Sequence, residues 1–166
     1  TWPSRLGVGM LGGLCLVMLA IGFNPALGAR LYFHPAYDPV WRGLVAQLVH
    51  LNASHLLMNL LALLILGWMA HGMGRSGALP GCLIVSALAV CLGLQSETPA
   101  LAWYVGLSGA LHGLAVWLAL ELAWQTPSRP LRLAALLICA GLAAKLGLGA
   151  RGGLLANLPV AHNAHL

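Results

Sequence analysis

Long apolar segments alternate with short polar breaks along the whole chain. Five of these segments are complete, and they cover residues 6–23, 54–72, 78–94, 108–124 and 131–144. Each holds about 14 to 19 residues, near the roughly 17–25 that a helix needs to cross the hydrocarbon core of a bilayer. Another apolar run begins near Leu154 and reaches the end of the chain after about a dozen residues. We therefore predict an all-α, polytopic membrane helix bundle of six transmembrane helices, with the sixth truncated in this chain.

The breaks between the apolar segments have the composition of loops. They are rich in Pro, Gly and other turn-forming residues, and they cover residues 24–25, 34–39, 72–77, 95–99 and 126–130. The chain contains no internal repeat of the kind that builds transporters from two halves, so one transmembrane domain over residues 1–166 is expected. Two glycine pairs, Gly9/Gly13 and Gly109/Gly113, have the spacing that lets helices pack closely in lipid.

The composition agrees with a membrane protein. Hydrophobic residues make up 60% of the 166 positions and charged residues only 7%, and the mean hydropathy is +0.89. A soluble domain carries about 25% charged residues, and a disordered chain combines low hydrophobicity with high charge, so both classes are excluded. The net charge of +5 reflects a shortage of acids, and the eight scattered cations form no cluster that would bind nucleic acid. The four cysteines lie in apolar runs without metal-ligand spacing, so neither a metal nor a cofactor is expected.

A few polar residues interrupt the apolar segments, and they gather at one depth. His55 and Asn59 lie in the first turns of the second predicted span, Ser108 lies at the start of the fourth, and His162 and His165 lie early in the sixth. Even-numbered spans all run in the same direction, so their first turns meet at the same face of the membrane. Polar side chains are costly in a bilayer and mark functional sites by default. The pattern therefore indicates a site of Ser, His and Asn side chains near one membrane surface.

The segment around Ser108 has features that suit a nucleophile. Gly106 and Gly109 flank Leu107 and Ser108 at a loop-to-helix junction, where glycine allows unusual backbone angles. The free N–H groups of a helix N-terminus suit a developing oxyanion. A helix-capping serine accounts for this short motif about equally well. His112 lies one turn further on and leans back towards Ser108, so spacing alone leaves it open as a general base.

Taken in order, the polar motifs resemble those of the rhomboid intramembrane serine proteases. They are His50-x4-His55-x3-Asn59, Gly106-x-Ser108-Gly109 and Ala164-His165, preceded by Trp41-Arg42 in the first long loop. Residues 103–113 are similar to the rhombosortase branch of that family. This bacterial branch is associated with proteins that end in a Gly-Gly motif, a hydrophobic segment and basic residues.

The resemblance implies roles for the residues of the site. Ser108 is expected to be the nucleophile and His165 its general base. The oxyanion is expected to be held by His55, Asn59 and the backbone N–H of Ser108. The remaining candidates, which would bind substrate or support the reaction, are Gly106, Leu107, His112, His50 and His162. At position 112 the family usually has a tyrosine, so this chain departs from the family pattern there. His112 therefore remains a candidate general base beside His165.

The activity implied by the resemblance is hydrolysis of a peptide bond in or near the single transmembrane segment of a membrane-anchored protein, with Gly-Gly sorting tails of exported proteins as the expected substrates. The chain would be a multi-pass protein of the bacterial inner membrane, surrounded by lipid, with its site near the extracytoplasmic face and no nucleic-acid partner. A Ser–His dyad is favoured over a triad. Glu121, the one acid in the span of Ser108, lies thirteen residues away, or about 20 Å along a helix.

Two other classes of function stay open at this point. A non-catalytic rhomboid-like protein binds transmembrane segments without cleaving them, but such relatives typically lack the serine or the histidine that this chain retains. A proton-coupled carrier would need ionisable residues along a path through the membrane, whereas those of this chain gather at one end.

Overall fold

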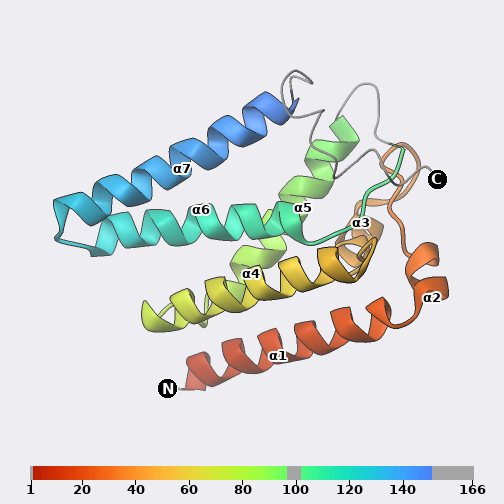
Figure 1. Cartoon of the computed structure of the whole chain (residues 1–166), viewed down its shortest axis with the longest axis horizontal. Helices are drawn as coiled ribbons and strands as arrows, with labels where there is room; N and C mark the ends of the chain where they lie inside the picture. Colours follow the sequence, from red (N-terminus) through yellow and green to blue (C-terminus); the bar gives the residue numbers. More distant parts are fainter. Residues whose placement is uncertain (1, 97–101, 151–166) are drawn as a thin grey trace. The chain divides into compact units, whose positions relative to one another are not determined.

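Helices form all the regular secondary structure that is described. The computed structural model describes residues 2–96 and 102–150, without the side chains of 2–6, 8 and 145–150. Within these ranges the helices are α1 (Trp2–Gly22), α2 (Pro25–Arg30), α3 (Val40–Ala46), α4 (Ala53–Gly72), α5 (Leu79–Ser96), α6 (Ser108–Gln125) and α7 (Arg129–Ala150) (Figure 1). The only strand-like pairing among the described residues is one isolated antiparallel bridge between Phe33 and Tyr104. The all-α prediction is therefore confirmed.

Each of the five complete apolar segments forms a helix, namely α1, α4, α5, α6 or α7. Among the described residues, α4 and α5 are long and apolar enough to cross a membrane by length and composition, and α1 holds a shorter apolar stretch at Gly9–Gly22. The predicted sixth span, from Leu154 onwards, lies outside the described residues.

The sequence predicts loop-like breaks at residues 24–25 and 34–39 and a long loop around Trp41-Arg42. This prediction is wrong in part, because the segment between α1 and α4 contains the short helices α2 and α3. Asn24 caps α2 by accepting a hydrogen bond from the Leu27 N–H at 3.1 Å, and Pro25 fits the first helical position because its missing N–H needs no partner there. The same residues that predicted a break therefore start a helix.

A carboxylate and a guanidinium hold this segment together ahead of α3. The Asp38 side chain accepts a hydrogen bond from the His34 backbone N–H at 2.8 Å and forms an ion pair with Arg42 at 3.4 Å. Arg42 in turn donates to the carbonyl of Arg30 at 3.0 Å, which ties α3 back to the end of α2. The His34 N–H and the Arg42 guanidinium are among the groups that hold the pKa of Asp38 below its usual value.

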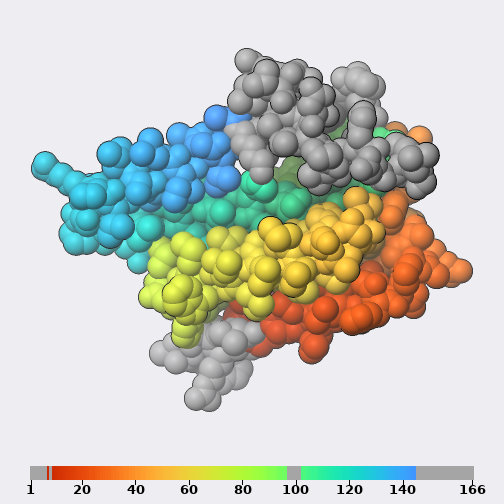
Figure 2. Space-filling view, viewed as in Figure 1, coloured from red at the N-terminus to blue at the C-terminus, as the bar shows by residue number. Residues whose placement is uncertain are grey.

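The chain divides into two compact units, residues 1–118 and 119–166. In the first unit α1 packs along α4, and α3 packs against α5. Figure 2 shows the side chains of α1 and α4 in contact along much of their length. The core of this unit consists of buried apolar side chains that include Met18, Leu63, Leu79, Leu107, Leu114 and Leu118.

The second unit contains the end of α6 and the whole of α7. Small residues pack here, with Ala119 and Ala123 of α6 buried against Ala135 of α7. The Arg132 guanidinium donates to the carbonyl of Ala123 at 3.1 Å and to that of Thr126 at 3.0 Å. These bonds satisfy carbonyls at the C-terminal end of α6, where the helix offers them no partner of its own.

The two glycine pairs differ in their surroundings. A Cβ added at Gly109 would lie 2.9 Å from Val90 Cγ2, and one added at Gly113 would lie 2.7 Å from Ser86 Cβ, so the first turns of α6 press closely on α5. A Cβ at Gly9 or Gly13 would meet nothing within 4 Å among the described residues. The packing prediction is therefore confirmed for Gly109/Gly113 and wrong for Gly9/Gly13 within the part of the chain that is described.

Candidate active site

His55 and Asn59 lie in the first two turns of α4, where the chain caps its own helix. The Asn52 side chain accepts a hydrogen bond from the His55 backbone N–H at 2.8 Å, which satisfies one of the free donors at the helix start. Asn59 is buried, with 4% of its surface exposed, and its Nδ2 donates to the His55 carbonyl at 2.8 Å. The four-residue spacing therefore places both side chains on one helix face, as the sequence predicts.

His50 packs on His55 just before α4 begins. The two imidazole rings meet edge to face, with centroids 5.0 Å apart, and the His50 Nδ1–H donates to the Leu48 carbonyl at 3.2 Å. Burial and the neighbouring His55 lower the pKa of His50 to about 4, so this imidazole is neutral at pH 7. Nε2 of His50 and Nδ1 of His55 are buried and have no hydrogen-bond partner among the described residues.

Gly106 brings the segment before α6 directly onto the His55 ring. Its φ is +106°, a conformation that side-chain-bearing residues rarely adopt. A Cβ at this position would lie 2.7 Å from Cε1 and 3.0 Å from Nε2 of His55, so only glycine fits the approach. The Gly106 N–H donates to the Ala46 carbonyl at 3.1 Å and thereby fixes the turn to the end of α3.

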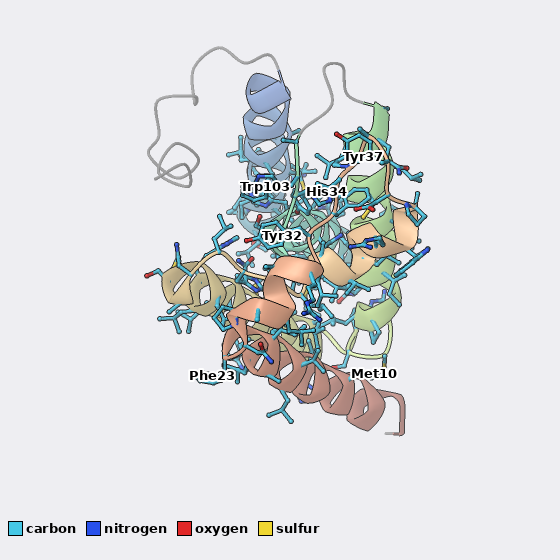
Figure 3. The ribbon with its side chains drawn as sticks, turned by 90° about the vertical axis from the view of Figure 1, so that its right-hand side faces the viewer. Met10, Phe23, Tyr32, His34, Tyr37 and Trp103 are labelled. Carbon is cyan, nitrogen blue, oxygen red and sulfur yellow. The ribbon has the colours of Figure 1, made fainter. Side chains whose placement is uncertain are left out.

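Residues 102–107 are held to the first loop by backbone and ring contacts. Phe33 and Tyr104 exchange two backbone hydrogen bonds, of 3.2 and 2.8 Å. Beside this bridge the rings of Tyr32 and Trp103 lie 5.2 Å apart, and Figure 3 shows these two side chains close together. The turn that precedes Ser108 is therefore positioned by a segment about seventy residues earlier in the chain.

Ser108 is the first residue of α6 and is exposed. Its position places it at the positive end of the helix dipole, where backbone N–H groups lack helical partners. His112 lies one turn further on, and its Nδ1–H donates to the Ser108 carbonyl at 2.7 Å. That bond draws the imidazole back towards the N-terminal end of α6, in the direction that the sequence predicts. Leu107 is buried in the apolar core and thereby holds the start of α6 in place.

An apolar cleft of about 570 Å³ opens beside His50. Its walls come from the end of α1, from α2 and from the first turns of α4, and they include Leu19, Phe23, Tyr32, His50, Leu56 and Leu60. Sequence reasoning did not find this cleft, because its lining residues are ordinary apolar positions that lie far apart in the chain.

Two residues next to the site carry no sequence prediction. Gln47 is buried, with 1% of its surface exposed, and its Nε2 donates to the Ala87 carbonyl at 3.0 Å. The hydroxyl of Tyr104 donates to the Gly106 carbonyl at 2.9 Å. A polar Gln in the otherwise apolar stretch 43–49 was the one available signal for Gln47.

The predicted site residues are only partly placed by the structure. The structure brings His50 and His55 together with the turn that leads to Ser108. His162 and His165 lie outside the described residues, so the Ser108–His165 pair stays a prediction.

Comparison with known protein families assigns the chain to one family. The Rhomboid domain family matches residues 37–166, a range that begins just before α3 and contains every candidate residue of the site. No curated protein and no solved structure matches the chain. The match covers most of the chain, and the chain therefore belongs to the rhomboid family, whose members are integral membrane proteins and generally serine proteases that act on membrane-protein substrates.

Proposed function

We propose that this protein is an intramembrane serine endopeptidase with Ser108 as its nucleophile. The observation that carries the proposal is the position of Ser108, exposed at the first residue of α6, directly after a glycine turn that rests on the His55 ring. The glycine turn brings the His55 ring close to the start of α6, and the helix start supplies N–H groups for a developing negative charge.

The proposed reaction is acyl transfer through a Ser–His dyad. His165 accepts the Ser108 hydroxyl proton as the oxygen attacks the scissile carbonyl, and the same proton then passes to the leaving amine as the C–N bond breaks. Water next attacks the acyl-enzyme while His165 accepts its proton, and His165 returns that proton to the Ser108 oxygen as the acyl C–O bond breaks and the carboxylic product leaves. The backbone N–H of Ser108, together with the side chains of His55 and Asn59, would hold the oxyanion at both tetrahedral stages.

His112 is the competing general base. Its Nδ1 bond to the Ser108 carbonyl keeps the ring on the serine side of α6. His165 is preferred because of its place in the rhomboid motifs, and substitution distinguishes the two. If His165 is the base, His165→Ala removes cleavage and His112→Gln reduces it only in part; the reverse result would assign the role to His112.

The substrate is proposed to be a membrane-anchored protein with a single transmembrane segment, which enters from the side and unwinds near the surface. An apolar residue of that segment fits the cleft beside His50, whose walls are mainly apolar. The likeness of residues 103–113 to the rhombosortase branch supports Gly-Gly sorting tails as natural substrates. It also supports a place in the bacterial inner membrane with the site near the extracytoplasmic face. Residues 1–166 are proposed to act as one transmembrane domain.

A fluorophosphonate probe tests the serine assignment in the full chain. The wild type is expected to be labelled, and Ser108→Ala is expected to lose both labelling and cleavage of a single-span model substrate bearing a Gly-Gly tail. Ser54→Ala is the matched control, because Ser54 is also an exposed serine at the start of a helix. Retained cleavage in Ser108→Ala would refute the assignment. An unlabelled wild type that still cross-links to transmembrane segments would instead indicate a non-catalytic binder.

A further inference from the structure

Tyr104 lies beside the proposed site without being one of its reacting groups. Its backbone is held by the two hydrogen bonds to Phe33, which is fully buried. Its hydroxyl donates to the Gly106 carbonyl at 2.9 Å. The phenol is therefore fixed at both ends, with its backbone on the first loop and its hydroxyl on the glycine turn.

The bond from Tyr104 acts on a peptide unit that would otherwise rotate easily. The carbonyl of Gly106 and the N–H of Leu107 belong to one planar trans peptide, so they point in opposite directions. Glycine has no Cβ, so the rotation about the Cα–C bond of Gly106, which turns this peptide, meets little steric resistance. A hydroxyl bound to the carbonyl removes that freedom, and it directs the Leu107 N–H away from Tyr104.

The same hydroxyl reaches the first turn of α6. A Cβ added at Gly109 would lie 3.0 Å from the Tyr104 hydroxyl oxygen, so only glycine lets the phenol come this close to the helix. Burial raises the pKa of Tyr104, while hydrogen bonds with the Gly109 backbone and the Ser108 side chain act in the lowering direction. The hydroxyl is thus protonated at neutral pH and lies among the groups that start α6.

We propose that Tyr104 is a positioning residue, whose hydroxyl fixes the Gly106–Leu107 peptide and the first turn of α6 so that Ser108 and its neighbouring N–H groups are held ready for the oxyanion. The inference rests on the proposed serine protease function. Tyr104 takes up no proton and forms no covalent bond in the proposed reaction, and its effect acts through the turn and the start of α6.

The test is Tyr104→Phe, which removes the hydroxyl and keeps the ring. One neutral hydrogen bond corresponds to roughly a 3- to 10-fold change in rate. We therefore expect fluorophosphonate labelling and kcat to fall by about that factor, with KM nearly unchanged and the melting temperature lowered by only about 2–4 °C. Tyr37→Phe is the matched control, because it makes the same chemical change at a tyrosine that is 83% exposed.

A second variant distinguishes a positioning role of the Tyr104 hydroxyl from an effect of Tyr104 on folding. Replacement of Tyr104 by a fluorotyrosine keeps the hydroxyl and lowers its pKa. The hydroxyl must be protonated to donate to Gly106, so the alkaline fall of the labelling rate is expected to move to lower pH. If Tyr104 served packing alone, the pH at which the labelling rate falls would not change. An unchanged pH therefore overturns the proposal, whether or not Tyr104→Phe folds.

The outcomes also separate this inference from the proposed function. If the wild type is labelled, Ser108→Ala is not, and Tyr104→Phe reacts at the wild-type rate, the positioning role is wrong and the protease assignment stands. If neither the wild type nor Ser108→Ala is labelled, the protease assignment fails and the positioning role fails with it.

Discussion

Gly106→Ala is expected to displace the His55 imidazole and to lower activity by about 100-fold. The added Cβ would lie 2.7 Å from His55 Cε1, whereas carbon atoms in contact normally stay about 3.5–4.0 Å apart, so the ring must move by roughly 1 Å. A displacement of about 1 Å at a catalytic group is enough for a 100-fold loss of rate. The positive φ adds strain of at least about 1–2 kcal/mol to the folded state.

The assay is the initial rate of cleavage of a single-span substrate in proteoliposomes, measured beside fluorophosphonate labelling and thermal unfolding. Gly93→Ala in α5 is the matched control, since a Cβ there would meet nothing within 4 Å. A helical Gly→Ala change of this kind is expected to stabilise the protein by about 0.5–1 kcal/mol and to leave the rate unchanged.

A double variant identifies the displaced group. If Gly106→Ala acts by moving His55, adding it to His55→Ala removes little further activity, because the ring that it displaces is already absent. Wild-type activity in Gly106→Ala would refute the reasoning. Fully additive losses in the double variant would show that the turn acts through something other than His55.

Three further outcomes follow from the packing around the site. The folded pKa of His50 is about 4 against an ordinary value of 6.5, so the unfolded chain binds more protons between these pH values and stability falls as pH drops through that window. His50→Gln is expected to make the melting temperature depend less on pH over this range. An unchanged dependence on pH would contradict the prediction. Gln47→Ala should lower stability by about 2–3 kcal/mol in denaturant titration, because it leaves a cavity. Gln47→Leu should stay within about 1 kcal/mol, because it fills most of that space and because the lost bond to Ala87 is offset by removal of the buried Oε1, which has no partner among the described residues. Gly113→Ala should destabilise the protein by about 1–3 kcal/mol, since its Cβ would press on Ser86. Ser86→Gly should restore part of that loss in a melting experiment, and no restoration would place the clash elsewhere.

The helices could be predicted from the sequence because a chain in lipid must satisfy its backbone groups within each segment. Long uncharged runs therefore correspond to α1, α4, α5, α6 and α7. The rare polar positions predicted that the first turns of α4 and α6 lie close together. Parallel helices bring equal depths together, and the structure accordingly places the turn before Ser108 on the ring of His55.

Other features depend on which faces meet, and an apolar pattern does not contain that information. The same glycine spacing packs on α5 at Gly109/Gly113 and is open at Gly9/Gly13 among the described residues. The short helices α2 and α3 depend on local caps and on the Asp38–Arg42 pair, which a list of turn-forming residues does not reveal. The bond from Tyr104 to Gly106 needs the bridge to Phe33, far away in the chain. The hydrophobic pattern of the sequence shows which segments are apolar enough to form helices of the bundle. Many arrangements of these helices would bury the same apolar surface, and the long-range contacts stabilise one of them over the others.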